Sequence, residues 1–324
     1  MTARSNNDTL ITIYGGSGFL GRHVVRALAK RDYRIRVAVR RPDLANFLQP
    51  LGRVGQIHAV QANLRDDASV AAAARGAHVL INLVGLLQEG GRQRFDSIHT
   101  QGAERVALAA NAQGSRLVHV SAIGADENST AAYARSKAAA ERLILNAQPR
   151  AIVMRPSIMF GPEDDFFNRF AALARMSPVL PLIGGGLTRF QPVFVGDVAT
   201  AIADAADGKL TGGTIYELGG PEVHTFKELM AYMLATIERR RMLVPLPFFA
   251  AKFKAMFLQF APAPLTLTPG QVEMLRSDNV VSEAAIAEDR TLSGIGIDPE
   301  PIEAIVPSYL WRFRKTGQFR SRAA

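Results

Sequence analysis

A glycine-rich turn near the N-terminus constrains the fold of this chain more than any other stretch. The sequence from Ile11 to Gly21 reads ITIYGGSGFLG, in which a short apolar run stops at Gly15 and an amphipathic stretch, Phe19–Lys30, follows. Glycines allow a sharp turn and a close approach of the backbone to phosphates, and the next helix offers N–H groups and a positive dipole end. A strand, a glycine turn and a helix in this order predict a dinucleotide-binding site.

Strand and helix patterns alternate well beyond this turn. Six short apolar runs are typical of strands: Leu10–Tyr14, Ile35–Val39, Ile57–Val60, Val79–Val84, Leu117–Val120 and Ala151–Met154. Segments between them carry apolar residues at helical spacing, as in Val70–Ala74, Ile98–Ala112 and Ala134–Leu145. This alternation predicts an α/β Rossmann fold, a doubly wound parallel sheet with right-handed crossovers.

The regular alternation ends after Arg155. Beyond it the pattern predicts helices over Phe166–Arg175, Asp197–Ala206 and Phe226–Arg239, and strands over Gln191–Val195 and Ile215–Leu218. The stretch PVLPLIGGG (178–186) is predicted to be a loop. We therefore expect an NAD(P)-binding Rossmann domain over residues 8–220 and a smaller, mostly helical region over 221–324 that contacts substrate, a partner or a membrane.

Composition narrows the class of protein. With 324 residues, 48% hydrophobic and 21% charged, the chain can bury a sizeable core. It has no cysteine, which excludes disulfides and thiolate catalysis, and its six histidines show no metal-ligand spacing, so we expect no metal. No apolar run reaches about 18 residues and the first residues lack a secretory pattern, so we expect a cytoplasmic protein.

The chain is basic, with a net charge of +9. Cations cluster in its last third: Arg239, Arg240, Arg241, Lys252, Lys254, Arg312, Arg314, Lys315, Arg320 and Arg322. Such a balance suits nucleic acid, an anionic membrane surface or phosphorylated ligands. Nucleic acid is the weaker interpretation, because no helix-turn-helix, zinc-finger or RNP-like pattern accompanies these residues.

Residues after the second and third strands bear on the choice of cofactor. The second strand ends in VAVRRP, which places Arg40 and Arg41 where NAD-selective Rossmann folds carry an acid. Two guanidinium groups suit a 2′-phosphate and favour NADP(H) over NAD(H), the alternative being a solvated basic loop. Asn63 and Leu64 follow the third strand, where side chains often meet adenine, although Asn63 could equally form a turn.

Three residues further along indicate chemistry. Ser121 follows the fifth strand, and Tyr133 and Lys137 stand four residues apart in YARSK, on one face of a predicted helix. A nearby lysine can stabilise a phenolate, so Lys137 would lower the pKa of Tyr133 and let it exchange a proton, while Ser121 polarises a substrate oxygen. After a glycine-rich turn, this order of residues is specific.

From these motifs the chain resembles the short-chain dehydrogenase/reductase superfamily, in its extended or atypical form. The resemblance covers roughly Leu10 to Pro221 and rests on GGSGFLG, NLVG, HVSA, YARSK and RPSIMFG. The passages RPSIMFGPEDDFFNRFA, FQPVFVGDVATAI and VPLPFFAAKF are similar to the accessory subunits of respiratory complex I of this type and to their bacterial relatives. That resemblance implies tight NADPH binding without known turnover, and an association of related proteins with ubiquinone biosynthesis.

The resemblance also implies roles for individual residues. The pyrophosphate would lie against the glycine turn, at Gly15, Ser17, Gly18, Phe19, Leu20 and Gly21. Arg40 would hold the 2′-phosphate, Val84 and Gly85 would line the adenosine side, and Tyr133, Lys137 and Pro156 would surround the nicotinamide and its ribose. Many members carry a water-ordering asparagine on the helix after the fourth strand, where this chain has His99. His99 could organise that water or be a packing histidine.

An aromatic segment leaves two interpretations open. Between residues 248 and 260, Phe249, Phe253, Met256, Phe257 and Phe260 recur at helical spacing, with Lys252 and Lys254 off that stripe. The segment is too short to span a bilayer, so it is either a core helix or an interfacial helix on an anionic membrane surface.

Two classes of function follow. The first is an NADP(H)-binding protein of the respiratory chain or of ubiquinone metabolism, peripheral to the inner membrane and in contact with respiratory-chain or quinone-biosynthesis proteins. It would be either an accessory or assembly module or a reductase of a quinone-like substrate. The second is a soluble NAD(P)-dependent oxidoreductase or epimerase of a sugar nucleotide or another hydroxyl compound.

Overall fold

The computed structural model describes residues 6–261 and 264–317, so Arg320 and Arg322 lie outside the described residues. The chain forms two compact units. Unit 1 comprises the described residues up to Pro156, Gly196–Leu218 and Ala284–Ile297, and unit 2 comprises the rest. This differs from the predicted division at residues 220 and 221. The late segment of unit 1 is held to the last strand of its sheet, since Glu217 N–H donates to the carbonyl of Arg290 (2.9 Å).

Unit 1 is built on one seven-stranded sheet. Its strands are β1 (Leu10–Tyr14), β2 (Arg34–Val39), β3 (Ile57–Gln61), β4 (Val79–Asn82), β5 (Arg116–Val120), β6 (Ile152–Pro156) and β11 (Ile215–Leu218). Their order is β11-β6-β5-β4-β1-β2-β3, and every neighbouring pair is parallel. The strand order reverses between β1 and β4, where doubly wound sheets bind their ligands. The predicted Rossmann fold is confirmed.

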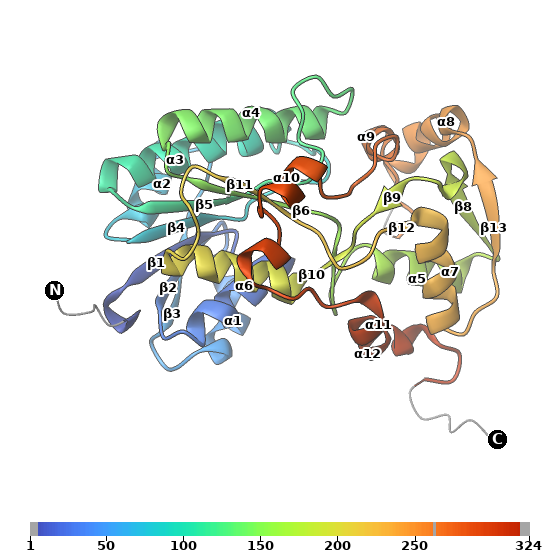
Figure 1. The fold of residues 1–324 in the computed structure, drawn as a ribbon, viewed down its shortest axis with the longest axis horizontal. Coiled ribbons are helices and arrows are strands. Elements are labelled where there is room, and N and C mark those ends of the chain that lie inside the picture. The colour runs from blue at the N-terminus through green and yellow to red at the C-terminus, as the bar shows by residue number, and fades with distance from the viewer. Residues whose placement is uncertain (1–5, 262–263, 318–324) are drawn as a thin grey trace. The chain divides into compact units, whose positions relative to one another are not determined.

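Helices cover both faces of this sheet. They are α1 (Phe19–Ala29), α2 (Asp67–Ala74), α3 (Gln101–Gln113), α4 (Ala132–Ala147) and α6 (Val195–Asp207), with the short α10 (Glu283–Ala287). Figure 1 shows α2, α3 and α4 over one face and α1 and α6 over the other. Leu80 and Leu117 of the sheet share a buried cluster with Ala107 of α3 and Ile144 of α4. Small alanines on the helices, among them Ala107 and Ala140, let them approach the sheet closely.

Unit 2 combines short strands with helices. Its strands are β7 (Met159–Phe160), β8 (Val179–Ile183), β9 (Arg189–Phe190), β10 (Val193–Phe194), β12 (His224–Thr225) and β13 (Met242–Leu246). Its helices are α5 (Phe167–Met176), α7 (Phe226–Thr236), α8 (Phe248–Leu258), α9 (Pro269–Met274), α11 (Ile302–Ile305) and α12 (Pro307–Leu310). The strands form three separate pairs, β10-β7, β12-β9 and β13-β8. The core is aromatic, with Phe160, Phe167, Phe226 and Tyr309 in one cluster.

Two local predictions are wrong. Residues 178–186 are not a loop throughout, because β8 pairs with β13 in parallel. Pro181 and Pro245 lack an N–H, but a two-stranded ribbon has an open edge on each strand where that group is not required. The predicted strand over Gln191–Val195 shrinks to β10, since α6 already begins at Val195.

The aromatic segment forms helix α8, and its stripe faces solvent. Phe249, Phe253 and Phe257 are 77%, 63% and 66% exposed. The core-helix interpretation is therefore wrong for these side chains, whereas Ala251 and Ala255 of the same helix are fully buried. None of the helices in the described ranges is long and apolar enough to cross a membrane.

Candidate active site

The glycine turn forms a tight cradle between β1 and α1. Gly15 has a left-handed backbone (φ +81°) and accepts a hydrogen bond from Gly18 N–H (3.1 Å). A Cβ added to Gly21 would lie 2.5 Å from the Gly15 carbonyl oxygen, so a side chain is excluded there. Gly18 caps α1 without any side-chain hydrogen bond, which directs the first N–H groups of this helix to an outside acceptor. The residues present fit a pyrophosphate.

The other predicted cofactor residues gather at the same edge of the sheet. Arg40 follows β2, Asn63 follows β3, Val84 and Gly85 follow β4, and Pro156 ends β6. Because all these strands are parallel, their carboxyl ends meet at one edge, the edge that carries the glycine cradle. A Cβ on Gly15 would touch Val84 Cγ2 at 3.0 Å, which brings the β1 and β4 ends into direct contact. Ser17 and Phe19 are half-buried, and Leu20 is buried.

The two arginines after β2 differ in their surroundings. Arg41 forms an ion pair with Asp43 (2.8 Å), and both side chains are exposed. Arg40 is exposed and has no ion-pair partner among the described residues. A contact of Arg40 with a 2′-phosphate stays a prediction.

The residues after β3 serve local structure. Asn63 Oδ1 accepts a hydrogen bond from Arg65 N–H (3.1 Å), and Asn63 N–H donates to Ser69 Oγ (3.0 Å). These bonds favour the turn-forming role for Asn63. Leu64 is buried in the cluster between the sheet and α2 and α3. Contact of either residue with adenine stays a prediction.

Ser121, Tyr133 and Lys137 come together above the end of β5. Lys137 is buried, and its Nζ donates to the carbonyl oxygen of Val120 (3.1 Å). The same Nζ lies 6.0 Å from the centroid of the Tyr133 ring. Ser121 Oγ is buried and has no hydrogen-bond partner in the described part of the chain. An unpaired buried hydroxyl costs stability, so this group is suited to accept or donate a bond to a bound molecule.

Burial moves the pKa values of Tyr133 and Lys137 in opposite directions. It raises the pKa of the Tyr133 phenol to about 12, and it lowers the pKa of the Lys137 ammonium to about 8, against the opposing effect of Glu141. The sequence predicts a Tyr133 pKa lowered by Lys137, but the pKa is raised, and burial is the cause of its shift. Near neutral pH the phenol is therefore protonated, and Tyr133 is better placed to donate a proton than to remove one.

His99 belongs to a hydrogen-bond chain beside this triad. Its Nε2 accepts from Leu86 N–H (2.7 Å), so the ring proton resides on Nδ1, which contacts Ser136 Oγ (2.9 Å). Ser136 Oγ in turn donates to the Tyr133 carbonyl (2.7 Å). Both ring nitrogens are engaged, which favours the packing role over the water-ordering one. Burial, with a smaller contribution from Lys137, lowers the pKa of His99 to about 3.

His119 and Arg155 were not singled out by the sequence motifs. His119 is fully enclosed on β5, with no partner for either ring nitrogen in the residues that the structure describes. Burial first, then the charge of Lys137, lowers its pKa well below the ordinary range. Arg155 of β6 holds Glu141 of α4 through two hydrogen bonds (2.9 and 2.6 Å), one helical turn beyond Lys137. The motifs HVSA and RPSIMFG contain these two residues, but they assign neither of them a role.

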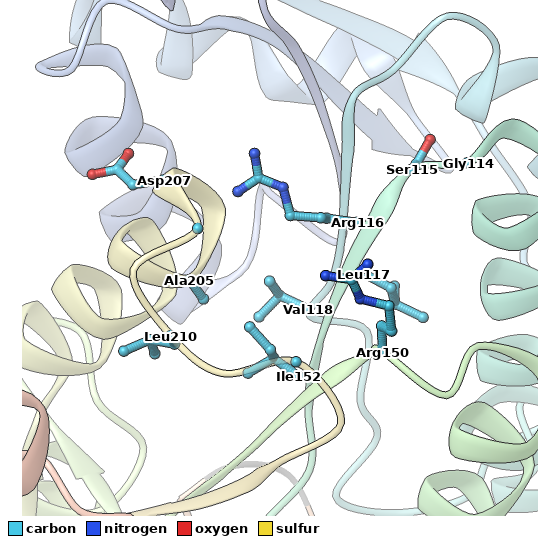
Figure 2. A pocket seen from close by; sticks show the side chains of 12 residues that line it. Gly114, Ser115, Arg116, Leu117, Val118, Arg150, Ile152, Ala205, Asp207 and Leu210 are labelled. Atoms are coloured by element: carbon cyan, nitrogen blue, oxygen red, sulfur yellow. The ribbon is translucent and has the colours of Figure 1, made fainter.

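A cavity of about 480 Å³ in unit 1 lies apart from these residues. It opens at the amino ends of the strands, next to Arg116, the first residue of β5, and Ile152, the first of β6. Figure 2 shows Arg116 extending toward the end of α6, where its guanidinium donates to the Ala206 carbonyl (2.8 Å). The triad and the glycine cradle lie at the opposite, carboxyl edge. We therefore place the candidate site by strand topology and side-chain chemistry.

A Rossmann sheet with this cradle and this triad defines a nucleotide-binding protein of the oxidoreductase and epimerase type. The chain matches the NAD dependent epimerase/dehydratase family over residues 11–219, and it belongs to this family.

Relatives extend the similarity beyond that domain. The chain is 37% identical to the NADH dehydrogenase [ubiquinone] 1 alpha subcomplex subunit 9, mitochondrial, of Arabidopsis thaliana, over 97% of this chain and 80% of that protein. It is 32% identical to a ceramide reductase of Caulobacter vibrioides, over 86% of this chain and 88% of that protein. The fold is shared with an NADPH-dependent quinone oxidoreductase of Escherichia coli solved with NADPH (TM-score 0.71, 21% identity, 93% of this chain and 99% of that one).

Proposed function

We propose that the chain binds NADP(H) and reduces a carbonyl or quinone group of an apolar molecule, in the respiratory chain or in quinone metabolism, at the membrane periphery. The triad carries this proposal. Ser121 Oγ is buried without a partner, the Tyr133 phenol is protonated near neutral pH, and Lys137 is fixed by the Val120 carbonyl (3.1 Å). A substrate carbonyl in reach of these groups meets one hydrogen-bond donor and one proton donor.

The balance of atoms in this reduction is simple. When bound, the nicotinamide of NADPH would supply a hydride to a ketone carbon or to a quinone ring. Ser121 would orient the substrate oxygen, and Tyr133 would transfer its phenolic proton to that oxygen, so that hydride and proton together convert a ketone to an alcohol or a quinone to a hydroquinone. The Lys137 ammonium stabilises the phenolate that remains. Glu141 and Arg155 hold the helix that carries both residues.

Two relatives of different function support an apolar substrate. One relative is a subunit of a ubiquinone-linked dehydrogenase, and another is a reductase of ceramide, which is a lipid. The preference for NADP(H) is supported by Arg40, whose guanidinium has no ion-pair partner among the described residues.

A second candidate is a nucleotide-binding accessory subunit that holds NADP(H) without turning it over. Its support is the similarity to the plant complex I subunit along 97% of this chain. In that case the cradle would serve stability or assembly, and the triad would be retained as a cofactor contact.

The test starts with mass spectrometry of small molecules released from the purified protein. NADPH oxidation is then followed with a short-chain ubiquinone and with a ketone-bearing ceramide precursor. Conversion of UDP-glucose is followed by the reduction of NADP+ and by chromatography of the sugar nucleotide. For a reductase we expect turnover with one of the two apolar compounds, and Tyr133→Phe should lower its rate by roughly 10²–10⁴-fold. Tyr216→Phe is the matched control, since Tyr216 lies on β11, where its hydroxyl accepts from Thr211 N–H (3.1 Å).

Each other outcome has a definite meaning. Bound NADPH that no compound oxidises supports the accessory subunit. Turnover of the sugar nucleotide alone overturns the apolar substrate, and turnover that survives Tyr133→Phe removes the proton transfer from Tyr133.

A further inference from the structure

Helix α8 is packed with its small residues inward and its large ones outward. Ala251 and Ala255, one turn apart, are fully buried against Ile183 and Val272. On the opposite face the phenyl rings of Phe249, Phe253 and Phe257 face solvent. An ordinary surface helix buries its large apolar side chains. Phe248, the first residue of α8, also packs against this cluster, but the packing of the helix in unit 2 does not use the phenylalanines that follow it.

The exposed side chains form one continuous stripe along the helix. Its members are spaced at helical intervals and are all more than half exposed: Phe249, Phe253, Met256, Phe257 and Phe260. Phe253 and Phe257 contact each other edge to face, with centroids 5.4 Å apart. Contiguous apolar surface of this kind on a monomer marks a contact site.

Charge identifies the kind of surface that this stripe meets. Lys252 and Lys254 are exposed on the same helix, and the sequence has five cationic and no acidic residues between Glu238 and Glu273. Glu273 itself is paired with Lys252 (3.4 Å) and Arg276 (3.3 Å). Arg276 also lies over the ring of Phe248 at the start of α8 (4.6 Å), so the three cations at this helix, Lys252, Lys254 and Arg276, outnumber the one acid, Glu273. This positive excess complements anionic lipid headgroups.

The lysines beside the stripe favour lipid over a protein partner. Protein interfaces are enriched in aromatic residues, methionine and arginine and are depleted of lysine. The stripe has four phenylalanines and a methionine, none of which offers a hydrogen bond, and lysines flank it. A helix of eleven residues is too short to span a bilayer but can lie in its interface with its apolar face in the acyl region.

We propose that α8 is a membrane-docking helix that inserts the stripe into an anionic bilayer surface, with Lys252 and Lys254 at the headgroups. This inference adds a contact surface to the membrane periphery in the proposed function. It does not depend on turnover, so it is tested on the protein whether or not a substrate is found.

The experiment is flotation of the full chain with vesicles. One set is phosphatidylcholine alone, and the other is an equimolar mixture with phosphatidylglycerol. We expect binding to the anionic set at low salt, weakened as salt screens the lysines. Phe253→Ser with Phe257→Ser should lower the partition coefficient at least tenfold, and Lys252→Gln and Lys254→Gln should each lower it about fivefold. Leu108→Ser on α3, where Leu108 is 53% exposed, is the matched control.

Folding and self-association are measured on the same samples. Circular dichroism and thermal melting check that the variants are folded. Because the stripe lies outside the core, its substitution should leave Tm near that of the wild type. Failure of the wild type to float with anionic vesicles overturns the proposal, as does equal flotation of the stripe variant. If light scattering shows a dimer that depends on the stripe, and the protein does not bind vesicles, the stripe is instead the interface with a second copy of the chain.

Discussion

Two clusters of buried polar groups, one in each unit, differ in how their members are paired. Unit 1 encloses His119 and Ser121 without partners in the described structure and buries the Lys137 ammonium, whose pKa falls to about 8. Unit 2 pairs its buried Asp164 with the hydroxyl of Tyr309 and with main-chain N–H groups. Unpaired buried groups cost stability, whereas paired ones need not. Unit 1 therefore carries a cost at the place where a ligand would use these groups, and unit 2 uses its polar groups for folding.

The apolar surface shows the opposite contrast. In unit 1, helix α1 buries Val24, Val25 and Leu28 completely. In unit 2, helix α8 buries two alanines and exposes Phe249, Phe253 and Phe257. The function proposed for unit 1 rests on polar groups that are buried, whereas the docking proposed for unit 2 rests on apolar groups that are exposed.

The largest effect is expected for Lys137→Met, which should make unit 1 more stable at pH 7. The fall in the Lys137 pKa from 10.5 to about 8 corresponds to about 3 kcal/mol of cost to the folded state, and losing the bond to Val120 offsets about 1 kcal/mol. We expect a net gain of about 2 kcal/mol in the free energy of unfolding, measured by urea denaturation, together with loss of any turnover.

The pH dependence of the free energy of unfolding tests the sign of this prediction. The folded protein releases the Lys137 proton near pH 8 and the unfolded chain near 10.5, so wild-type stability rises with pH between these values. The gap between variant and wild type should narrow over that window. Lys209→Met is the control, because Lys209 is exposed and paired with Asp204 (2.6 Å). A Lys137→Met protein less stable than wild type at pH 7 would contradict the contrast between the units.

Tyr309→Phe tests the other side of the comparison and should destabilise unit 2. It leaves the buried Asp164 carboxylate with main-chain N–H groups, those of Gly161, Phe167 and Asn168, at a cost of about 2 kcal/mol at neutral pH. Burial raises the pKa of Asp164, and the Tyr309 hydroxyl opposes this rise, so the variant should raise that pKa further.

A raised carboxyl pKa means that stability falls as pH rises through it, since the unfolded chain gives up the proton first. The loss in Tyr309→Phe should accordingly shrink on acidification toward pH 4. Tyr232→Phe is the matched control in the same unit, because its hydroxyl donates to the Ile302 carbonyl (3.2 Å) and no charge depends on it. Equal losses in both variants would show that Asp164 does not need its partner.

Most of unit 1 could be predicted from sequence because its signals are local. The turn at Gly15, the strand runs and the four-residue spacing of Tyr133 and Lys137 each need only neighbouring residues, and parallel topology then brings the strand ends together. The Tyr133 pKa could not be predicted, since burial depends on Phe95 and His99, which pack edge-on against its ring.

Unit 2 resisted prediction for the same physical reason. The β8-β13 pair joins segments about sixty residues apart across two proline-containing strands, and Asp164 meets a tyrosine 145 positions away. The sequence could not predict that the apolar stripe of α8 is exposed. Helical spacing shows that the stripe exists, but it does not show whether the rest of the unit covers it.

The smallest expected effect concerns the exposed rim of unit 1, at Arg40. If the cradle holds NADPH, Arg40→Ala should weaken NADPH binding about tenfold and leave NADH binding unchanged, because only the former carries a 2′-phosphate. Arg41→Ala should change neither by more than about twofold, since Arg41 already pairs with Asp43 (2.8 Å) in water, where such pairs contribute little. Fluorescence titration of both dinucleotides measures this. If Arg40→Ala lowers the affinities for NADPH and NADH equally, Arg40 acts on the shape of the loop. If only Arg41→Ala lowers the affinity for NADPH, Arg41 and not Arg40 contacts the phosphate.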